Sequence, residues 1–208
     1  MSQKNRKMKI VGMIVWIMTS VFLIYSFDGH AQESDIDALI QKLKSKDAAI
    51  RIEAVQELST RKDPRIVDPL IAALKDENRE VRSRTAIVLG KMKDPRSSGS
   101  LVQALKDRDP IVRENAAFAL GEIRSVQSLE PLIEALKDER RMVRNNAAKA
   151  VVEIGSPSVE PLVIALKDKS PDVQRYASWA LRRITGQQLE GQVDWQAWWV
   201  RNSDLFSE

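Results

Sequence analysis

A segment of about thirty-one residues recurs along most of this chain. Five leucines at equivalent places mark the copies, and their spacings are 31, 31, 31 and 30 residues: Leu43, Leu74, Leu105, Leu136 and Leu166. Four copies read ALKDENREVRSRTAIVLGKM, ALKDRDPIVRENAAFALGEI, ALKDERRMVRNNAAKAVVEI and ALKDKSPDVQRYASWALRRI, and a weaker first copy reads KLKSKDAAIRIEAVQELSTR. A single unit of this size cannot bury its apolar face alone, so the period predicts a linear stack of units in contact with their neighbours.

Each copy is predicted to be a pair of helices. In the fourth copy, an apolar stripe at steps of three and four residues indicates one buried helical face: Val143, Ala147, Val151 and Ile154. Asp138 precedes this helix and is predicted to be its N-cap. Alanine dominates the middle of the second helix of each pair, which lets neighbouring helices approach closely.

The A-L-K-D, V-R, A-A-x-A-L-G-x-I and E-P-L pattern of residues 35–186 resembles the short HEAT-like repeats first described in phycobilisome lyase subunits. The resemblance implies an all-α fold, a right-handed α-solenoid (HEAT/armadillo-like superhelix) of about five two-helix repeats plus a C-terminal capping helix. It says little about activity, because fold alone does not fix function.

Three parts of the chain are expected from these patterns. Residues 1–31 form a signal peptide or an N-terminal membrane anchor. Residues 32–186 form the solenoid, with repeats at about 35–63, 64–94, 95–125, 126–155 and 156–186. Residues 187–208 form a tryptophan-rich cap or tail.

The first part is predicted to direct the chain across a membrane. Residues 10–27 carry no charge and follow a basic cluster, and Gly29-His30-Ala31 places small residues where a signal peptidase cuts. Cleavage after Ala31 and a retained anchor both remain open. In either case the basic flank stays cytoplasmic, so the solenoid is predicted to be extracytoplasmic, in the periplasm or anchored with the solenoid outside.

Composition removes several classes of function. After residue 31 the chain carries 33 − 4 = 29 Lys and Arg against 29 − 1 = 28 Asp and Glu, and this near-neutral charge argues against nucleic-acid binding. Cysteine is absent and the one histidine, His30, lies in the leader. We therefore predict no catalytic residues, no cofactor and no metal site, and a chain that is not an enzyme.

An aspartate and an arginine six residues apart recur in three successive copies: Asp76 and Arg82, Asp107 and Arg113, Asp138 and Arg144. Arginines in such a row would suit an anion-binding stripe. The favoured interpretation is structural, a ladder of ion pairs between neighbouring repeats, because one acid accompanies each arginine. The ladder is expected to fade in the first and last copies, which pair Ser45 with Arg51 and Asp168 with Gln174.

A partner is expected on the concave face, at the exposed positions of the second helices. These lie ten, thirteen and seventeen residues after each reference leucine: Glu53, Gln56, Thr60; Arg84, Ile87, Lys91; Asn115, Phe118, Glu122; Asn146, Lys149, Glu153; Tyr176, Trp179, Arg183. The large apolar members are candidate anchors for a partner. Packing of these side chains onto a neighbouring repeat or the cap is the alternative.

The C-terminal part is rich in aromatic residues. Thr185-Gly186 is a predicted helix stop, and Asp194 is a predicted N-cap of a short helix that carries Trp195, Trp198 and Trp199 on one side. This side is expected to cap the open end of the last repeat. A tryptophan patch for a partner or a membrane interface is the alternative.

These observations predict a non-catalytic interaction or scaffold module of the cell envelope, with an unidentified protein or peptide partner. The alternative is a component of a lyase- or hydroxylase-type enzyme. Deoxyhypusine hydroxylase resembles this fold, but the resemblance implies His-Glu motifs for iron, and the repeats contain no histidine. A purely architectural role is the third possibility.

Overall fold

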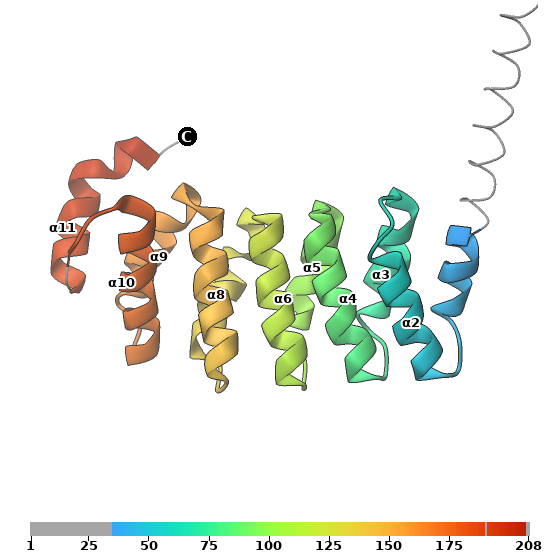
Figure 1. Cartoon of the computed structure of the whole chain (residues 1–208). Coiled ribbons are helices and arrows are strands. Elements are labelled where there is room, and N and C mark those ends of the chain that lie inside the picture. Colours follow the sequence, from blue (N-terminus) through green and yellow to red (C-terminus); the bar gives the residue numbers. More distant parts are fainter. Residues whose placement is uncertain (1–34, 190, 207–208) are drawn as a thin grey trace, which may run out of the picture.

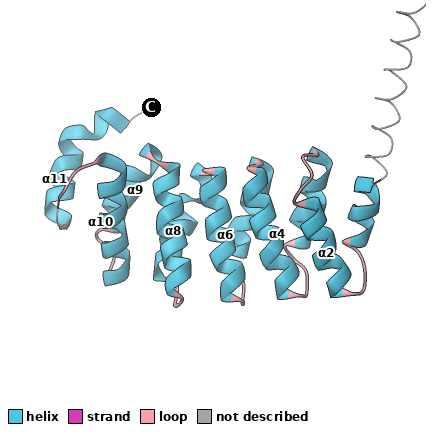
Figure 2. Cartoon of the chain, viewed as in Figure 1, coloured by secondary structure: helices cyan, strands magenta, loops and turns pink. Residues whose placement is uncertain are grey.

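A computed structural model describes residues 35–189 and 191–206 of the chain. The predicted leader, residues 1–31, lies outside the described residues. Within the described ranges the chain consists of helices and connecting loops without a strand (Figure 2). The all-α prediction is confirmed.

The helices alternate between two layers along the stack. The second helices of the five repeats are α2 Ala48–Leu58, α4 Arg79–Met92, α6 Pro110–Ile123, α8 Arg141–Ile154 and α10 Pro171–Thr185. The first helices are residues 35–42, α3 Val67–Ala73, α5 Ser98–Ala104, α7 Leu129–Glu134 and α9 Val159–Ala165. Short 3₁₀ turns lie beside the first helices: η1 Pro64–Ile66, η2 Pro95–Ser97, η3 Val126–Ser128, η4 Ala135–Lys137 and η5 Ser156–Ser158. Helix α11 Gln192–Asn202 and the turn η6 Ser203–Phe206 end the chain.

The two layers are packed to different densities. In Figure 1 the second helices stand side by side in one row, with the first helices in a row behind them. Helices α4, α6 and α8 contact one another closely, whereas successive first helices make few direct contacts. A stack that is more tightly spaced on one side bends towards that side, so the second helices form the inner, concave layer.

Glycine allows this close approach at two successive interfaces. A Cβ atom added to Gly90 of α4 would lie 2.7 Å from the Ala119 Cα atom of α6, and one added to Gly121 would lie 2.8 Å from the Ala150 Cα atom of α8. Both distances are shorter than a Cβ atom tolerates against a neighbouring backbone. The inner layer is therefore held together by backbone-to-backbone packing at these points.

Gly90→Ala is expected to destabilise the protein by about 1–3 kcal/mol, because the added methyl group pushes α4 and α6 apart. This loss opposes the gain of up to about 1 kcal/mol that alanine brings to a helix. Gly99→Ala in α5 is the matched control, since its Cβ atom would meet nothing within 4 Å. Urea unfolding of both variants should show opposite signs, and equal stabilisation by both would contradict close packing at Gly90.

The starts of two helices differ from the sequence prediction. The N-cap of α8 is Arg140, and the Asp138 carboxylate instead accepts a hydrogen bond of 2.8 Å from the Arg140 backbone N–H. Similarly, α11 begins after Gly191 and places Asp194 within its first turn. In the first case a tight turn formed by the aspartate separates it from the helix. The predicted stop after Thr185 is confirmed, since Gly186 follows α10 with a φ of 74°.

Candidate protein-binding surface

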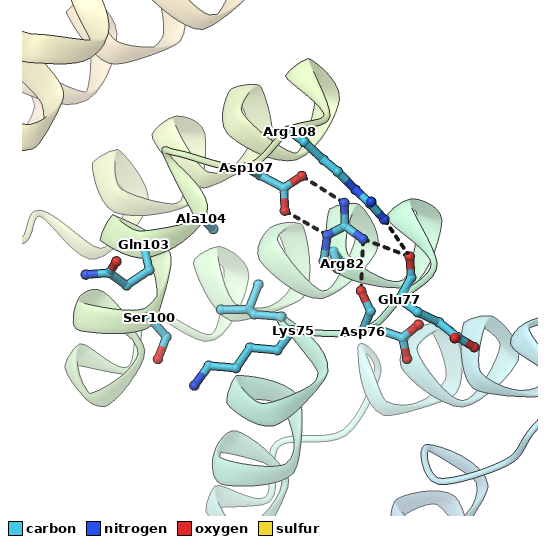
Figure 3. A pocket seen from close by; sticks show the side chains of 10 residues that line it. Lys75, Asp76, Glu77, Arg82, Ser100, Gln103, Ala104, Asp107 and Arg108 are labelled. Atoms are coloured by element: carbon cyan, nitrogen blue, oxygen red, sulfur yellow. Dashed lines mark hydrogen bonds and ion pairs between the residues drawn. The ribbon is translucent and has the colours of Figure 1, made fainter.

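The recurring arginines bridge neighbouring repeats. The Arg82 guanidinium donates two hydrogen bonds, of 2.7 and 2.8 Å, to the carboxylate of Asp107 in the next repeat. It also donates bonds of 2.8 and 3.1 Å to the backbone carbonyls of Asp76 and Glu77 in its own repeat (Figure 3). Arg113 makes the same contacts with Asp138 and with the Asp107 carbonyl. In its own repeat each arginine thus binds a carbonyl and not the aspartate side chain.

These pairs are buried. The side chains of Arg82 and Asp107 are only 6% and 12% exposed. Burial raises the pKa of Asp107, but hydrogen bonds from Arg82 and from the Asp109 N–H, together with the Arg82 charge, outweigh it and hold the pKa below its usual value. A surface cavity of about 520 Å³ opens beside this pair (Figure 3), yet four of the arginine's N–H donors are already bonded. The geometry therefore serves cohesion of the stack.

The ends of the ladder differ from the prediction in opposite ways. At the N-terminal end Arg51 is fully engaged, with two bonds of 2.7 Å to Asp76. At the other end Arg144 keeps the Asp138 carbonyl at 2.7 Å but does not pair with Asp168, which lies 3.1 Å from Lys137 instead. The expectation that the ladder fades at the first copy is wrong. Arg51 pairs with Asp76 of the next repeat, so an acid in its own repeat is not required.

A second, shorter row of arginines lies at the loops before the first helices, and the pattern of the first row did not predict it. Arg96 in η2 lies 2.8 Å from Asp94 and 3.5 Å from Asp68 of the preceding repeat. Arg65 in η1 contacts Asp63 and Asp37 in the same way. The hydrogen bonds from the arginine lower the pKa of Asp94. The signal was the Asp-Pro-Arg triplet, which recurs at an interval of thirty-one residues.

The predicted binding positions fall into three rows on the inner face. The N-terminal row comprises Glu53, Arg84, Asn115, Asn146 and Tyr176. The central row comprises Gln56, Ile87, Phe118, Lys149 and Trp179. The C-terminal row comprises Thr60, Lys91, Glu122, Glu153 and Arg183.

Much of the N-terminal row joins neighbouring helices. The Asn115 amide donates a bond of 2.8 Å to the Ser83 hydroxyl of the preceding repeat. Asn146 bonds to a carbonyl in the preceding repeat in a similar way, and the Tyr176 hydroxyl donates a bond of 2.7 Å to the Asn145 side chain. These three side chains are partly exposed, and they also connect neighbouring repeats through hydrogen bonds.

The C-terminal row is partly occupied by ion pairs between repeats. Glu122 lies 3.1 Å from Lys93, and Glu153 lies 3.1 Å from Arg124. Lys93 and Arg124 end their helices in the left-handed conformation, and each pairs with the repeat that follows. Both carboxylates of this row therefore have a cationic partner in the preceding repeat.

The central row is the most available for a partner. Phe118 is 40% exposed and Trp179 is 36% exposed, whereas Ile87 is only partly accessible. None of these side chains packs into the core, unlike the neighbouring alanines of the same helices. The row is a line of large side chains on a firmly bonded frame, a geometry that suits contact with an extended surface.

The aromatic C-terminal segment covers the end of the stack (Figure 1). Trp195 is fully buried and belongs to the hydrophobic core, and α11 packs against α9. Trp198 and Trp199 are half-buried and each stacks near Phe206, at ring-centroid distances of 5.7 and 5.9 Å. The three tryptophans therefore differ in burial, and the innermost acts as the anchor of the cap.

Two kinds of site are not found in the described part of the chain. Among residues 35–189 and 191–206, no group of three or more His, Cys, Asp and Glu side chains is arranged to hold a metal ion. No helix within these ranges is long and apolar enough to span a bilayer.

Comparison with known proteins identifies the repeat. A family model described as HEAT repeats matches residues 36–101 and 98–182. Among curated proteins, none matches this chain.

Several solved structures share the fold. The complex of CpcE and CpcF of phycocyanin lyase from a Nostoc species is 25% identical, with a TM-score of 0.59, and the match covers 73% of this chain and 65% of that chain. Human deoxyhypusine hydroxylase in complex with glycerol is 26% identical, with a TM-score of 0.53, and the match covers 76% and 65%. A designed armadillo repeat protein in complex with the peptide (KR)4 is 22% identical, with a TM-score of 0.53 over 81% and 87%. This chain thus spans about two thirds of the length of the two enzymes.

Proposed function

This chain belongs to the HEAT-repeat family, of the lyase HEAT-like type, and from that premise we propose that it is a non-catalytic interaction module that binds a protein or an extended peptide along its inner face. A solenoid of this kind fits a protein-binding scaffold. The inner face as the binding surface, and an extended contact along it, are the parts that we propose beyond the family assignment.

One observation carries the proposal. The central row presents Phe118 and Trp179 to solvent, although both side chains are large and apolar, while half of the positions in the polar rows on either side are engaged in bonds between repeats. Exposed aromatic side chains on a rigid frame are favourable contact points, because they bury a large area with little loss of conformational entropy.

Phe118→Ala is expected to weaken partner binding by about tenfold or more while leaving unfolding unchanged within about 0.5 kcal/mol. Affinity capture from soluble and membrane fractions, with the full-length chain as bait, provides the partner and the assay. Ile164→Ala is the matched control, since Ile164 is 62% exposed but lies on α9 in the other layer. Equal loss of binding in both variants would contradict a role for the inner face.

The location of the protein is a second part of the proposal. The uncharged residues 10–27 and the basic residues before them support export, with the solenoid outside the cytoplasmic membrane. N-terminal sequencing of the captured chain tests this directly. A start at Gln32 would establish cleavage after Ala31, and a retained Met1 in the membrane fraction would establish an anchor.

A subunit of a lyase- or hydroxylase-type enzyme is the second candidate, and the likeness to two enzyme structures supports it. The repeats contain no histidine or cysteine, so in this case a partner chain would contribute those groups. Co-purification of a catalytic subunit whose activity requires this chain would favour the enzyme candidate over a scaffold.

A further inference from the structure

The interface between the fourth and fifth repeats is packed differently from the two interfaces before it. Val152 occupies the place that Gly90 and Gly121 hold in the two earlier repeats, so the backbone contact made by those glycines is not available to α8. Helix α10 accordingly packs less closely against α8 than α8 does against α6.

The arginine ladder also stops at this interface. The Nε atom of Arg144 is buried and makes no hydrogen bond among the described residues, and its nearest acid is Asp172 at 3.6 Å. Gln174 stands where the earlier repeats carry arginine, and its amide bonds only to the Asp168 carbonyl of its own repeat. The two-bond arginine–aspartate pair that closes all three earlier interfaces and the glycine contact that closes two of them are thus both missing here.

A cavity of about 300 Å³ lies between the two helices on the inner face. Its lining consists of Asn145, Ala148, Lys149, Arg175, Tyr176 and Trp179. The Tyr176 hydroxyl bonds to Asn145 across the gap at 2.7 Å, and the Arg175 guanidinium lies 5.1 Å from the centre of the Tyr176 ring. Such a volume is at the lower limit for a small-molecule site and suits one large side chain.

The charges around this cavity favour an acidic partner. Its two charged lining residues are both cations. Arg175 is paired with Asp172 at 2.6 Å, whereas Lys149 has no carboxylate partner within the described ranges, and neither has Arg183 in the next repeat. Glu153, the neighbouring acid, is bound by Arg124. A segment that carries carboxylates would therefore find uncompensated positive charge here.

We propose that this cavity is the anchor site of the inner face, and that it takes one aromatic or large aliphatic side chain from an acidic segment of the partner. The inference rests on the proposed function, which it deepens by naming the pocket and the chemistry of the partner. The apolar side chain would lie against Ala148 and the Tyr176 and Trp179 rings. Its flanking carboxylates would lie near Lys149 and Arg183.

Selection of a phage-displayed library of random peptides on the immobilised full-length chain tests this inference. We expect enriched peptides that carry a large apolar residue flanked by aspartate or glutamate. Trp179→Ala should weaken their binding by about 30-fold or more. Lys149→Glu should weaken it by about tenfold, with a smaller loss as the ionic strength rises. Both side chains are exposed, so the melting temperatures should match that of the wild-type protein, and Ile164→Ala serves again as the control.

Three other outcomes would overturn the inference. Enrichment of basic peptides would reject the acidic partner. Peptides whose binding is lost with Phe118→Ala but retained with Trp179→Ala would reject the cavity and leave the proposed function standing. A library without any enriched peptide would count against both.

Discussion

Arg82→Ala is expected to lower the free energy of unfolding by about 3–5 kcal/mol, the range found when one partner of a buried ion pair is removed. The loss is large because Asp107 stays in a place where its carboxylate is only 12% exposed. Two backbone carbonyls also lose their donor. Urea unfolding followed by circular dichroism measures the effect. Arg113→Ala is expected to behave alike, since Arg113 makes the equivalent contacts.

Arg84→Ala provides the matched control. Arg84 is on the same helix, and its partner Glu80 lies 2.6 Å away, but the two side chains are 40% and 48% exposed. An exposed pair of this kind contributes about 0.5 kcal/mol or less. Peptides that bind the inner face should bind folded Arg82→Ala as tightly as the wild-type protein. An unchanged stability with lost binding would instead favour an anion- or partner-binding role for the arginine row.

Trp195→Ala is expected to destabilise the fifth repeat, at a cost of about 3–5 kcal/mol, because it empties a fully buried site between the cap and the last repeat. The terminal repeat has a neighbour on only one side, so loss of the cap exposes its apolar face. Hydrogen exchange should show faster exchange in α9 and α10 with little change in α4 and α6.

Val200→Ala tests whether this effect is specific to the buried side of α11. Val200 is 79% exposed on the same helix, so its truncation should change stability by no more than about 0.5 kcal/mol. Trp195→Phe should cost less than Trp195→Ala, because the indole N–H has no hydrogen-bond partner in the described structure and most of the ring volume is kept. Unchanged exchange in α9 after Trp195→Ala would contradict the role of α11 as a cap.

The regular part of the fold could be predicted in detail because the repeat encodes it locally. A stripe such as Val143 to Ile154 faces the core in any helix that carries it, whatever lies around it. The period of thirty-one residues then fixes the stacking, since every unit has the same apolar side to cover. The Asp-Pro-Arg triplet is also a regular signal, but its role became visible only with the neighbouring repeat in place. Each arginine pairs with an aspartate of the preceding repeat.

The candidate site could be predicted only in outline. Residue spacing selected the inner positions, but spacing cannot tell which of them are already bonded. Spacing selected both Asn115 and Trp179 as inner-face positions, yet one bonds to the preceding repeat and the other borders a cavity. That difference depends on the distance between adjacent helices.

By itself, therefore, the sequence determined the number of repeats, their helices and the ladder residues, because these follow from periodicity and side-chain chemistry within and between similar units. Only the tertiary structure decided where the ladder ends, which inner side chains are free, and that a cavity opens between α8 and α10. These depend on the few places where one repeat differs from the next, and a small change such as glycine to valine acts through the packing of whole helices.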